Sequence, residues 1–463
     1  MSEPANLFSG NGLPVAGNRS LEQWLAWQQQ IHTRAVELGL DRCRQVAARM
    51  GLLAPGYCVI SVAGTNGKGS SVAVLEAVLG RAGYRTGAYY SPHLVRYNER
   101  IRVAGREATD ADLCRVFARV EEARCGTVLT YFEFGTLAAL QLFREADVDV
   151  ALLEVGLGGR LDAVNVLDAD LALVTSVAMD HQEWLGDDRE AIGREKAGIF
   201  RPGVPAVCSD PAPPASLVAC ARRLRAPLSI LGRDFSCEKK EDGTGSWCWR
   251  GGGREYEGLP LSYPYGSCQV RNAAGALMAL DRLAGRLPVP ESAIVEGLKS
   301  CRLAGRCQVV PGLPPLLLDV AHNPQSALEL RRGLADLPVS GATHMVVGML
   351  RDKDHRAVFA ELDRAADYWH VVGLPGWRGA SAATLLAELR PVTDKPVRVY
   401  RHIWGALDRL SHSASAADRA VVTGSFLTVG GALNWLNCGV GAGRAAWRGL
   451  DGGELASGAL GGR

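Results

Sequence analysis

A lysine and a serine in a glycine-rich segment have the types and spacing needed to hold nucleotide phosphates. The segment spans residues 64–70 and has the sequence GTNGKGS. Glycines let backbone N–H groups approach phosphate oxygens, lysine neutralises their charge, and a serine hydroxyl is a ligand for Mg²⁺. One glycine separates Lys68 from Ser70, which departs from the common phosphate-loop spacing. The alternative, a glycine-rich turn without a ligand, leaves both polar side chains unexplained.

Two further polar positions follow apolar runs, at places where parallel strands bind ligands. Glu154 lies in the run 148–155, just before a glycine-rich loop. A carboxylate there is a natural Mg²⁺ ligand, and the alternative is a cap at the start of a turn. Ser91 opens a polar loop after the run 86–90, for which the alternative is an ordinary surface loop.

Four other residues are candidates whose types alone do not decide their roles. His181 follows an apolar run, but Mg²⁺ prefers oxygen, so by itself it is better explained as a structural histidine. Lys196 lies at a predicted helix end, where a solvated lysine is the simplest interpretation. Asp319 and His322 follow another apolar run, where they could contact a nucleotide or begin a helix.

The elements that must position these residues form two alternating patterns. From about residue 57 to 178, apolar runs alternate with helical stretches, which predicts βαβ units and a mostly parallel sheet. A second alternation begins after about residue 300. We therefore expect an α/β protein: an N-terminal P-loop-type ATPase domain with a mostly parallel sheet, plus a smaller Rossmann-like C-terminal α/β domain.

We place the domains at residues 1–300 and 301–438, followed by a Gly/Ala-rich tail at 439–463 that we expect to be disordered. Helical periodicity runs from Leu21 to about Met50, and residues 233–256 predict a β-hairpin.

Composition excludes several classes of protein. The 463 residues carry a formal net charge of only +2, which argues against nucleic-acid binding. No apolar run is long enough to span a bilayer, and residues 1–6 do not have the basic and apolar regions expected of a signal peptide. The 12 cysteines include no C-x-x-C pair, so we expect reduced thiols and a cytoplasmic location. From the charge and the apolar runs, we expect neither a nucleic-acid nor a membrane partner.

Taken together, the motifs resemble the bacterial bifunctional dihydrofolate synthase/folylpolyglutamate synthases, a family of Mur-ligase-like ATP-dependent amide ligases. The resemblance runs from about Leu21 to about Leu436. Its motifs, in order, are GTNGKGS (64–70), SPHLVRY (91–97), TYFE (130–133), LEVGLGGRLD (153–162), DH (180–181), EKAGI (195–199), DVAHNP (319–324), GMLRDKD (348–354) and TGSF (423–426).

The resemblance implies a role for each matching residue. The implied ATP contacts are Thr65, Asn66, Gly67, Lys68, Gly69, Ser70, Asn272, Arg306 and Asp319. The implied Mg²⁺ ligands are Ser70, Ser91, Glu154 and His181, and Lys196 is expected to be carbamylated. The implied dihydropteroate pocket comprises Gln30, Ile31, His32, Thr33, Thr130, Tyr131, Phe132, Glu133, Leu161, Asp162 and Ala163. The residues expected to act in the reaction are Lys68, His181, Lys196, Asp319 and His322.

The implied activity joins L-glutamate to dihydropteroate and adds further glutamates to tetrahydrofolates, with ATP consumed through an acyl phosphate. The small-molecule partners would be dihydropteroate, tetrahydrofolates, L-glutamate and ATP, and we expect a monomer. Three alternatives stay open: folylpolyglutamate synthase activity only, a peptidoglycan-precursor ligase, and a nucleotide-gated binding protein without catalysis. The pocket residues favour the bifunctional ligase over the first two. Intact Lys68, Glu154, His181 and Lys196 argue against the third.

Overall fold

The computed structural model describes residues 8–9, 13–14, 19–32, 37–240, 245–260 and 267–438. The chain divides into two compact units, Met1–Leu303 and Ala304–Arg463. The tail predicted at 439–463, and Thr33 of the predicted acceptor pocket, lie outside the described residues. No helix within the described ranges is both long enough and apolar enough to cross a membrane.

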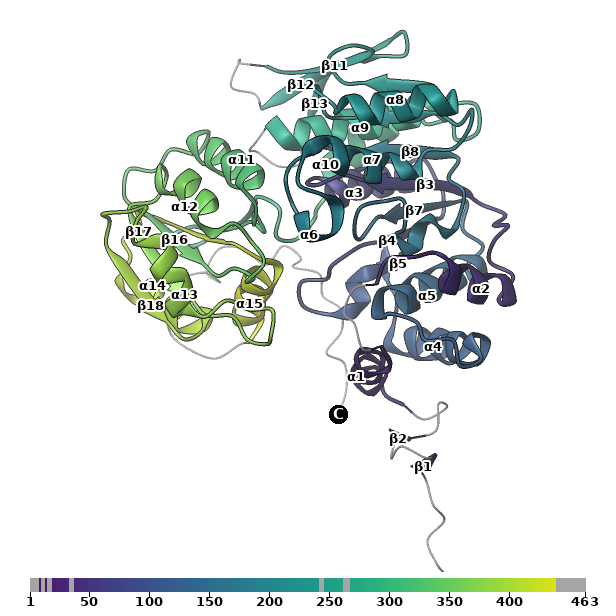
Figure 1. Cartoon of the computed structure of the whole chain (residues 1–463). Coiled ribbons are helices and arrows are strands. Elements are labelled where there is room, and N and C mark those ends of the chain that lie inside the picture. Colours follow the sequence, from purple (N-terminus) through teal and green to yellow (C-terminus); the bar gives the residue numbers. More distant parts are fainter. Residues whose placement is uncertain are drawn as a thin grey trace, which may run out of the picture. The chain divides into compact units, whose positions relative to one another are not determined.

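The first unit is built on an eight-stranded sheet (Figure 1). Its strands are β3 (Cys58–Ala63), β4 (Thr86–Tyr89), β5 (Ile101–Val103), β6 (Arg106–Glu107), β7 (Val150–Glu154), β8 (Leu171–Val174), β9 (Ala206–Cys208) and β10 (Leu228–Ile230). In the order β10-β9-β8-β3-β7-β4-β5-β6, all pairs from β10 to β4 are parallel, and β5 and β6 extend one edge as antiparallel strands. The predicted mostly parallel sheet is confirmed.

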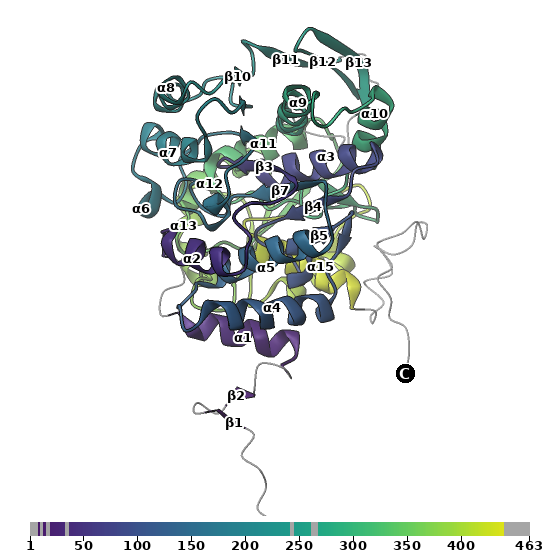
Figure 2. The same cartoon turned by 90° about the vertical axis from the view of Figure 1, so that its right-hand side faces the viewer.

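Helices cover both faces of this sheet, as a parallel sheet with two buried faces requires. They are α1 (Leu21–Ile31), α2 (Asp41–Arg49), α3 (Lys68–Arg81), α4 (Asp110–Arg124), α5 (Tyr131–Glu145), α6 (Gln182–Leu185), α7 (Arg189–Lys196), α8 (Ala215–Leu224), α9 (Ser267–Arg282) and α10 (Glu291–Ser300). Helices α1, α2, α4 and α5 lie on one side, and α3, α9 and α10 on the other (Figures 1 and 2). Three 3-10 turns are η2 (Tyr97–Arg100), η3 (Ala163–Val166) and η4 (Ala197–Ile199).

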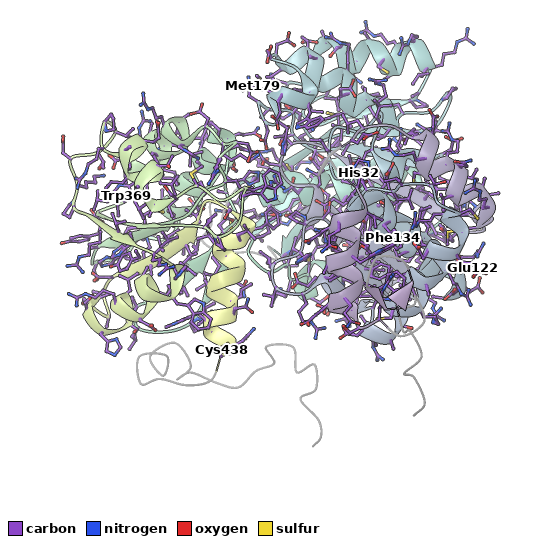
Figure 3. All side chains as sticks on the ribbon, turned by 60° about the horizontal axis from the view of Figure 1, so that its bottom comes forward. His32, Glu122, Phe134, Met179, Trp369 and Cys438 are labelled. Carbon is purple, nitrogen blue, oxygen red and sulfur yellow. The ribbon has the colours of Figure 1, made fainter. Side chains whose placement is uncertain are left out.

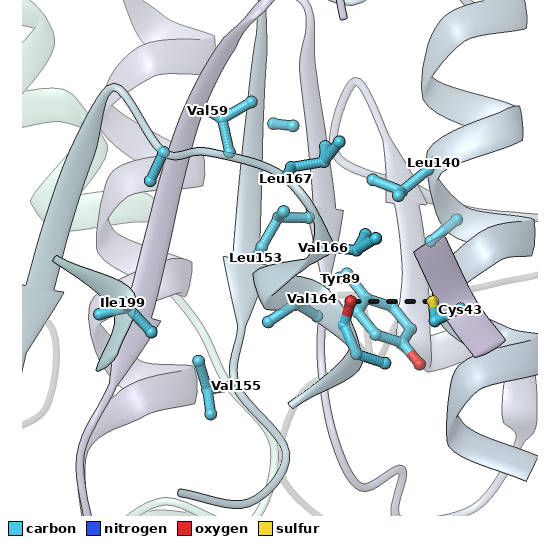
Figure 4. Close-up of a cluster of buried hydrophobic side chains, with 14 of the residues drawn as sticks. Cys43, Val59, Tyr89, Leu140, Leu153, Val155, Val164, Val166, Leu167 and Ile199 are labelled. Carbon is cyan, nitrogen blue, oxygen red and sulfur yellow. Dashed lines mark hydrogen bonds between the residues drawn. The ribbon is translucent and has the colours of Figure 1, made fainter. Parts of the chain in front are cut away.

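Strand side chains alternate between two cores on the two faces of the sheet. Val59 and Leu153 belong to one cluster, whereas Ile60 and Leu152 belong to the other. Figure 4 shows part of the first cluster, where the Cys43 thiol lies 3.9 Å from the carbonyl oxygen of Ala163. Val155 and Ala163, at the two ends of the loop that follows β7, belong to this cluster, so their burial anchors that loop to the core.

Two local expectations need correction. The single helical stretch predicted from Leu21 to about Met50 is two helices, because α1 ends at Ile31 and α2 begins at Asp41. The hairpin predicted at 233–256 is present, but a third strand makes it a sheet: β11 (Phe235–Lys239), β12 (Ser246–Gly251) and β13 (Arg254–Pro260). Trp247 and Trp249 of β12 are buried, which gives this small sheet an apolar face to pack. Two residue pairs, Phe8–Ser9 (β1) and Leu13–Pro14 (β2), form a short ladder of their own.

The second unit is a six-stranded sheet in the order β14-β15-β19-β16-β17-β18. Its strands are β14 (Gln308–Val310), β15 (Leu316–Leu318), β16 (Thr343–Val347), β17 (Tyr368–Val372), β18 (Val397–Tyr400) and β19 (Arg419–Thr423). Only the β14 pairing is antiparallel among the described pairs. Its helices are α11 (Pro324–Ala335), α12 (His355–Asp363), α13 (Ala382–Leu389), α14 (Ile403–Ser413) and α15 (Phe426–Asn437).

Apolar side chains of α11, α12 and α13 pack on one face of this second sheet, around Trp369 (Figure 3). Trp369 is fully buried, and its indole N–H donates to Asp363 over 3.0 Å. The alternation of apolar runs and helical stretches expected after about residue 300 is present, since the runs 316–320, 344–348 and 420–423 lie in β15, β16 and β19 with ends shifted by up to two residues. The predicted α/β class is therefore confirmed for both units.

Candidate active site

The glycine-rich segment forms the turn between β3 and α3. Gly67 adopts a left-handed φ of 93°, which glycine tolerates and other residues rarely do, and α3 begins at the next residue, Lys68. Its N-terminal amides therefore face the turn, as a phosphate site requires. Lys68 is half-buried, and its Nζ donates to the carbonyls of Gly64 (3.1 Å) and Thr65 (3.2 Å).

The chain after β8 braces this turn through residues that sequence reasoning missed. The Thr175 hydroxyl donates to the Asn66 carbonyl over 2.7 Å, and the Thr65 amide donates to the Ser176 carbonyl over 2.7 Å. The Thr65 hydroxyl exchanges hydrogen bonds with the backbone of Ala178, at 3.0 and 3.1 Å. The sequence feature that could have identified them is the pair of adjacent hydroxyl residues, Thr175 and Ser176, at the end of a predicted strand.

Asn272, about 200 residues further along the chain, lies against the same turn. A Cβ at Gly67 would come within 2.2 Å of Asn272 Oδ1, so only glycine fits between them. The Ser71 hydroxyl also contacts the Asn272 carbonyl at 3.4 Å. Asn272 comes from α9, and the fold brings it to the predicted phosphate site.

Three of the predicted metal ligands converge beside this turn. The Ser70 hydroxyl is buried without a hydrogen-bond partner in the described structure. Glu154, only 4% exposed at the end of β7, places Oε2 3.3 Å from where a Gly69 Cβ would be. The Ser91 amide donates to the same oxygen over 3.0 Å. A buried orphan hydroxyl beside a buried carboxylate fits a hard, oxygen-preferring cation such as Mg²⁺.

His181, the fourth predicted ligand, precedes α6. Its φ of 51° is unusual for a non-glycine residue, and such strained positions concentrate at functional sites. Its Nε2 lies 4.0 Å from Asp180 Oδ1. Within the described ranges no three His, Cys, Asp or Glu side chains form a metal cluster, so a cation here would depend on serine and phosphate oxygens as well.

Lys196, the last residue of α7, is buried and not solvated, which overturns the simplest interpretation from sequence. It is 3% exposed. Burial, with a smaller contribution from nearby Lys68, lowers its pKa to about 7, and Asp180 acts in the opposite direction. A substantial fraction of its amine is therefore neutral and nucleophilic at physiological pH.

The predicted acceptor pocket begins at the first turn of α5. Thr130 and Glu133 form a capping box, in which the Glu133 carboxylate accepts from the Thr130 amide (2.7 Å) and Thr130 Oγ1 accepts from the Glu133 amide (3.2 Å). Glu133 also pairs with Arg42 at 3.2 Å. Tyr131 and Phe132 are partly exposed, and a Cβ at Gly156 would lie 2.7 Å from the Phe132 ring. The fold thus brings Phe132 against the loop that carries the other pocket residues.

Asp162 organises that loop. Its carboxylate accepts from the amides of Leu157 (2.8 Å) and Val164 (3.1 Å), and it caps η3. Burial raises its pKa to about 7, although these backbone hydrogen bonds and Lys68 act in the opposite direction. The flanking Leu161 and Ala163 carbonyls accept from Gly39 N–H and the Cys43 thiol.

The end of α1 holds further residues of the predicted acceptor pocket. Gln30 is exposed and Ile31 is half-buried, while His32 lies 3.2 Å from Glu37, itself paired with Arg42. Figure 3 shows His32 and the buried Phe134 of α5 in the first unit. Gln28, which sequence reasoning did not select, is fully buried, and neither of its side-chain amide atoms has a hydrogen-bond partner within the described ranges.

The second unit holds Arg306, Asp319 and His322. The Asp319 carboxylate accepts from the amides of Cys307 (2.9 Å) and Ala321 (2.8 Å), so it ties the chain beside Arg306 to the end of β15. The Arg306 guanidinium lies 4.8 Å from the ring of Phe426. His322 Nδ1 lies 2.8 Å from the Val320 carbonyl, which favours the tautomer with the proton on Nδ1.

Comparisons with known proteins give a consistent result. Residues 305–426 match the model of the Mur ligase, glutamate ligase domain. A dihydrofolate synthase/folylpolyglutamate synthase of Escherichia coli (strain K12) is 44% identical over 409 residues, which cover 88% of this chain and 94% of that protein.

Solved structures agree. The E. coli FolC in complex with DHPP and ADP superposes with a TM-score of 0.86 and 42% identity, covering 91% of this chain and 98% of that one. A bifunctional folylpolyglutamate synthase/dihydrofolate synthase with Mn, AMPPNP and L-glutamate bound gives a TM-score of 0.84 and 44% identity, covering 92% and 100%.

Proposed function

We propose residue roles for an ATP-dependent ligase, on the premise that this chain belongs to the dihydrofolate synthase/folylpolyglutamate synthase family. As a member, it joins L-glutamate to dihydropteroate and adds further glutamates to tetrahydrofolates through an acyl phosphate. The observation that carries the site assignment is the buried, unpartnered Ser70 hydroxyl, together with Glu154, beside the turn that begins α3.

The first step transfers the γ-phosphoryl group of ATP to a substrate carboxylate, and ADP leaves. The amides of the turn and Lys68 hold the phosphates, so that catalysis is mainly positioning and charge neutralisation. Ser70, Ser91, Glu154 and His181 would hold a divalent cation, which supplies further neutralisation of phosphate charge. Asn272 supports the turn from α9.

The second step is attack of the neutral glutamate amine on the acyl carbon, with release of phosphate. A base must take the amine proton, and we assign this part to Asp319 or His322 of the second unit. We also assign Arg306 and Asp319 to nucleotide binding, and residues 1–300 and 301–438 to separate domains. We expect a monomeric, cytoplasmic enzyme whose cysteines stay reduced.

Lys196 is proposed to carry a carbamate. Its neutral nitrogen would attack CO₂, forming an N–C bond and releasing one proton, which leaves a buried anionic carbamate. Burial and a pKa near 7 support this because the attacking amine must be neutral. A mass increase of one CO₂ at Lys196 in native mass spectrometry, absent in Lys196→Arg, would test it.

The acceptor pocket is proposed to lie between the first turn of α5 and the loop that follows β7. The support is the contact of Phe132 with Gly156 and the anchoring of that loop by Asp162. Leu161, Ala163, Tyr131 and the end of α1 complete the proposed pocket.

The test is phosphate release by purified protein with MgATP and L-glutamate, with dihydropteroate and tetrahydrofolate offered separately. Release with both, accompanied by glutamylated products, is expected. Release with tetrahydrofolate alone would restrict the activity to polyglutamylation, and release with neither would reject the ligase.

A further inference from the structure

Arg100 is a buried guanidinium without a carboxylate partner in the part of the chain that the structure describes. It is 8% exposed. Its Nε donates to His93 Nδ1 over 2.8 Å, and its Cζ lies 5.4 and 5.5 Å from the rings of Tyr97 and Tyr131. A lone pair and two ring faces offset only part of the cost of burying a cation, so the site favours an anion.

Nearby carboxylates are already engaged elsewhere. Glu99 accepts from the amides of residues 94, 95 and 96, at 2.6 to 2.8 Å. Glu76 pairs with Arg102 at 3.1 Å and accepts from the Tyr90 hydroxyl at 2.9 Å. The anion that Arg100 lacks is therefore not one of these neighbouring side chains.

The position of Arg100 indicates which external anion it serves. Its carbonyl accepts from the Tyr90 amide over 2.8 Å, so it lies beside Ser91, whose amide holds Glu154. On its other side it packs against Tyr131, in the first turn of α5. Arg100 thus lies between the proposed cation site and the proposed acceptor pocket, within the first unit.

We propose that Arg100 binds the substrate carboxylate that is to be phosphorylated, an inference that rests on the proposed function. Both acceptors present such a carboxylate, whereas nucleotide phosphates already have Lys68 and the amides of α3. A guanidinium matches a carboxylate in a forked pair of hydrogen bonds. The guanidinium also reduces the electrostatic repulsion between the attacking carboxylate and the triphosphate. The carboxylate oxygen then bonds to the γ-phosphorus, while the bond from that phosphorus to the leaving ADP breaks.

His93 is a positioning residue in this arrangement. Because arginine is always a donor, Nδ1 of His93 must be the acceptor, and its ring proton therefore resides on Nε2. This hydrogen bond fixes the guanidinium plane and leaves its two terminal nitrogens for the carboxylate.

The test measures equilibrium binding of dihydropteroate and of its neutral carboxamide to the full chain in the presence of MgADP. The wild type should bind the acid about tenfold to a hundredfold more tightly than the amide, because a charge-assisted contact is lost in the amide. Arg100→Gln should bind the two ligands about equally. An undiminished preference for the acid in this variant would overturn the proposal.

Arg102→Gln is the matched control, since Arg102 lies two residues away but already pairs with Glu76 and the Gly105 carbonyl. It should keep the wild-type preference. Arg100→Lys retains the positive charge but cannot form the paired guanidinium hydrogen bonds, so it should show an intermediate preference for the acid. This variant provides the measurement if Arg100→Gln does not fold. Weaker ADP binding with an unchanged acid preference would instead place Arg100 at the nucleotide and reject the proposal.

Failure here is separable from failure of the ligase assignment. Wild-type protein that releases phosphate with dihydropteroate, but whose acid preference survives Arg100→Gln, retains the proposed function and loses only the inference. Wild-type protein that ligates neither acceptor loses both.

Discussion

The carboxyl ends of the two parallel sheets carry polar residues with contrasting surroundings. At the edge of the first sheet, Lys196 is buried, and among the described residues the Ser70 hydroxyl has no hydrogen-bond partner and Arg100 has no carboxylate partner. At the edge of the second, Asp319 accepts two backbone N–H groups, and Asn323 and Ser425 cap α11 and α15. The first edge requires ligands to satisfy its groups, whereas the second is largely satisfied by its own backbone.

This difference predicts that substitutions at the two edges will affect ligand binding and folding stability to different extents. Buried polar groups without partners reduce the stability of the empty protein, and a ligand that satisfies them gains affinity. Substitutions at the first edge should therefore affect ligand binding and rate more than folding. Those at the second should reduce folding stability as well.

The largest effect is expected for Lys68→Ala. Ligation should fall on the order of a thousandfold, because one preorganised positive contact to the transferring phosphoryl group is removed. The melting temperature should change little, since the hydrogen bonds of Nζ to the Gly64 and Thr65 carbonyls lie within its own turn. Phosphate release and circular dichroism measure the two quantities, and retained ligation would contradict the phosphate-site assignment.

Glu154→Gln should weaken Mn²⁺ binding in the presence of a non-hydrolysable ATP analogue by roughly tenfold to a hundredfold. The amide oxygen can still accept from the Ser91 amide, so the fold should survive. Titration of the free Mn²⁺ signal by electron paramagnetic resonance provides the measurement. Glu195→Gln, at a carboxylate paired with Arg160, is the control, and equal weakening in both variants would remove the ligand role from Glu154.

A smaller, pH-dependent effect is expected at Lys196. As pH falls below about 7, its amine becomes protonated, so carbamylation at fixed CO₂ pressure should decline by up to tenfold per pH unit. The uncarbamylated protein should also lose stability as pH falls from the unfolded pKa, 10.5, to about 7, because the unfolded state binds the proton first. Native mass spectrometry from pH 6 to 8 measures the carbamate, and a constant mass would count against it.

The smallest effect is expected at the second edge. Asn323→Ala should destabilise the protein by about 1 kcal/mol, because the Asn323 side chain accepts from the Ser326 amide at the start of α11. Urea unfolding monitored by tryptophan fluorescence provides the measurement. Asn323→Asp should keep the cap and most of the stability, and equal losses in both variants would show that capping is not the cause.

Much of the fold could be predicted from sequence because its signals are local. The turn between β3 and α3, Glu154 at the end of β7 and the strands of both sheets follow from apolar runs and glycine positions over a few residues. The break between α1 and α2 was missed because helical periodicity continues across residues 32–40. In the small sheet, the predicted hairpin corresponds to β12 and β13, which flank the three glycines at 251–253, and the strand that was not predicted is β11.

The sequence by itself determined the α/β class, the phosphate turn, the family and the residue types available for chemistry. Tertiary structure alone decided their surroundings. It buried Lys196, brought Asn272 and Thr175 to the phosphate turn, and left Gln30 exposed but Gln28 buried. It also enclosed Arg100 with no carboxylate partner among the residues that the structure describes. The physical reason is that burial, pKa and charge pairing depend on neighbours from distant segments, and no local pattern records which segments will meet.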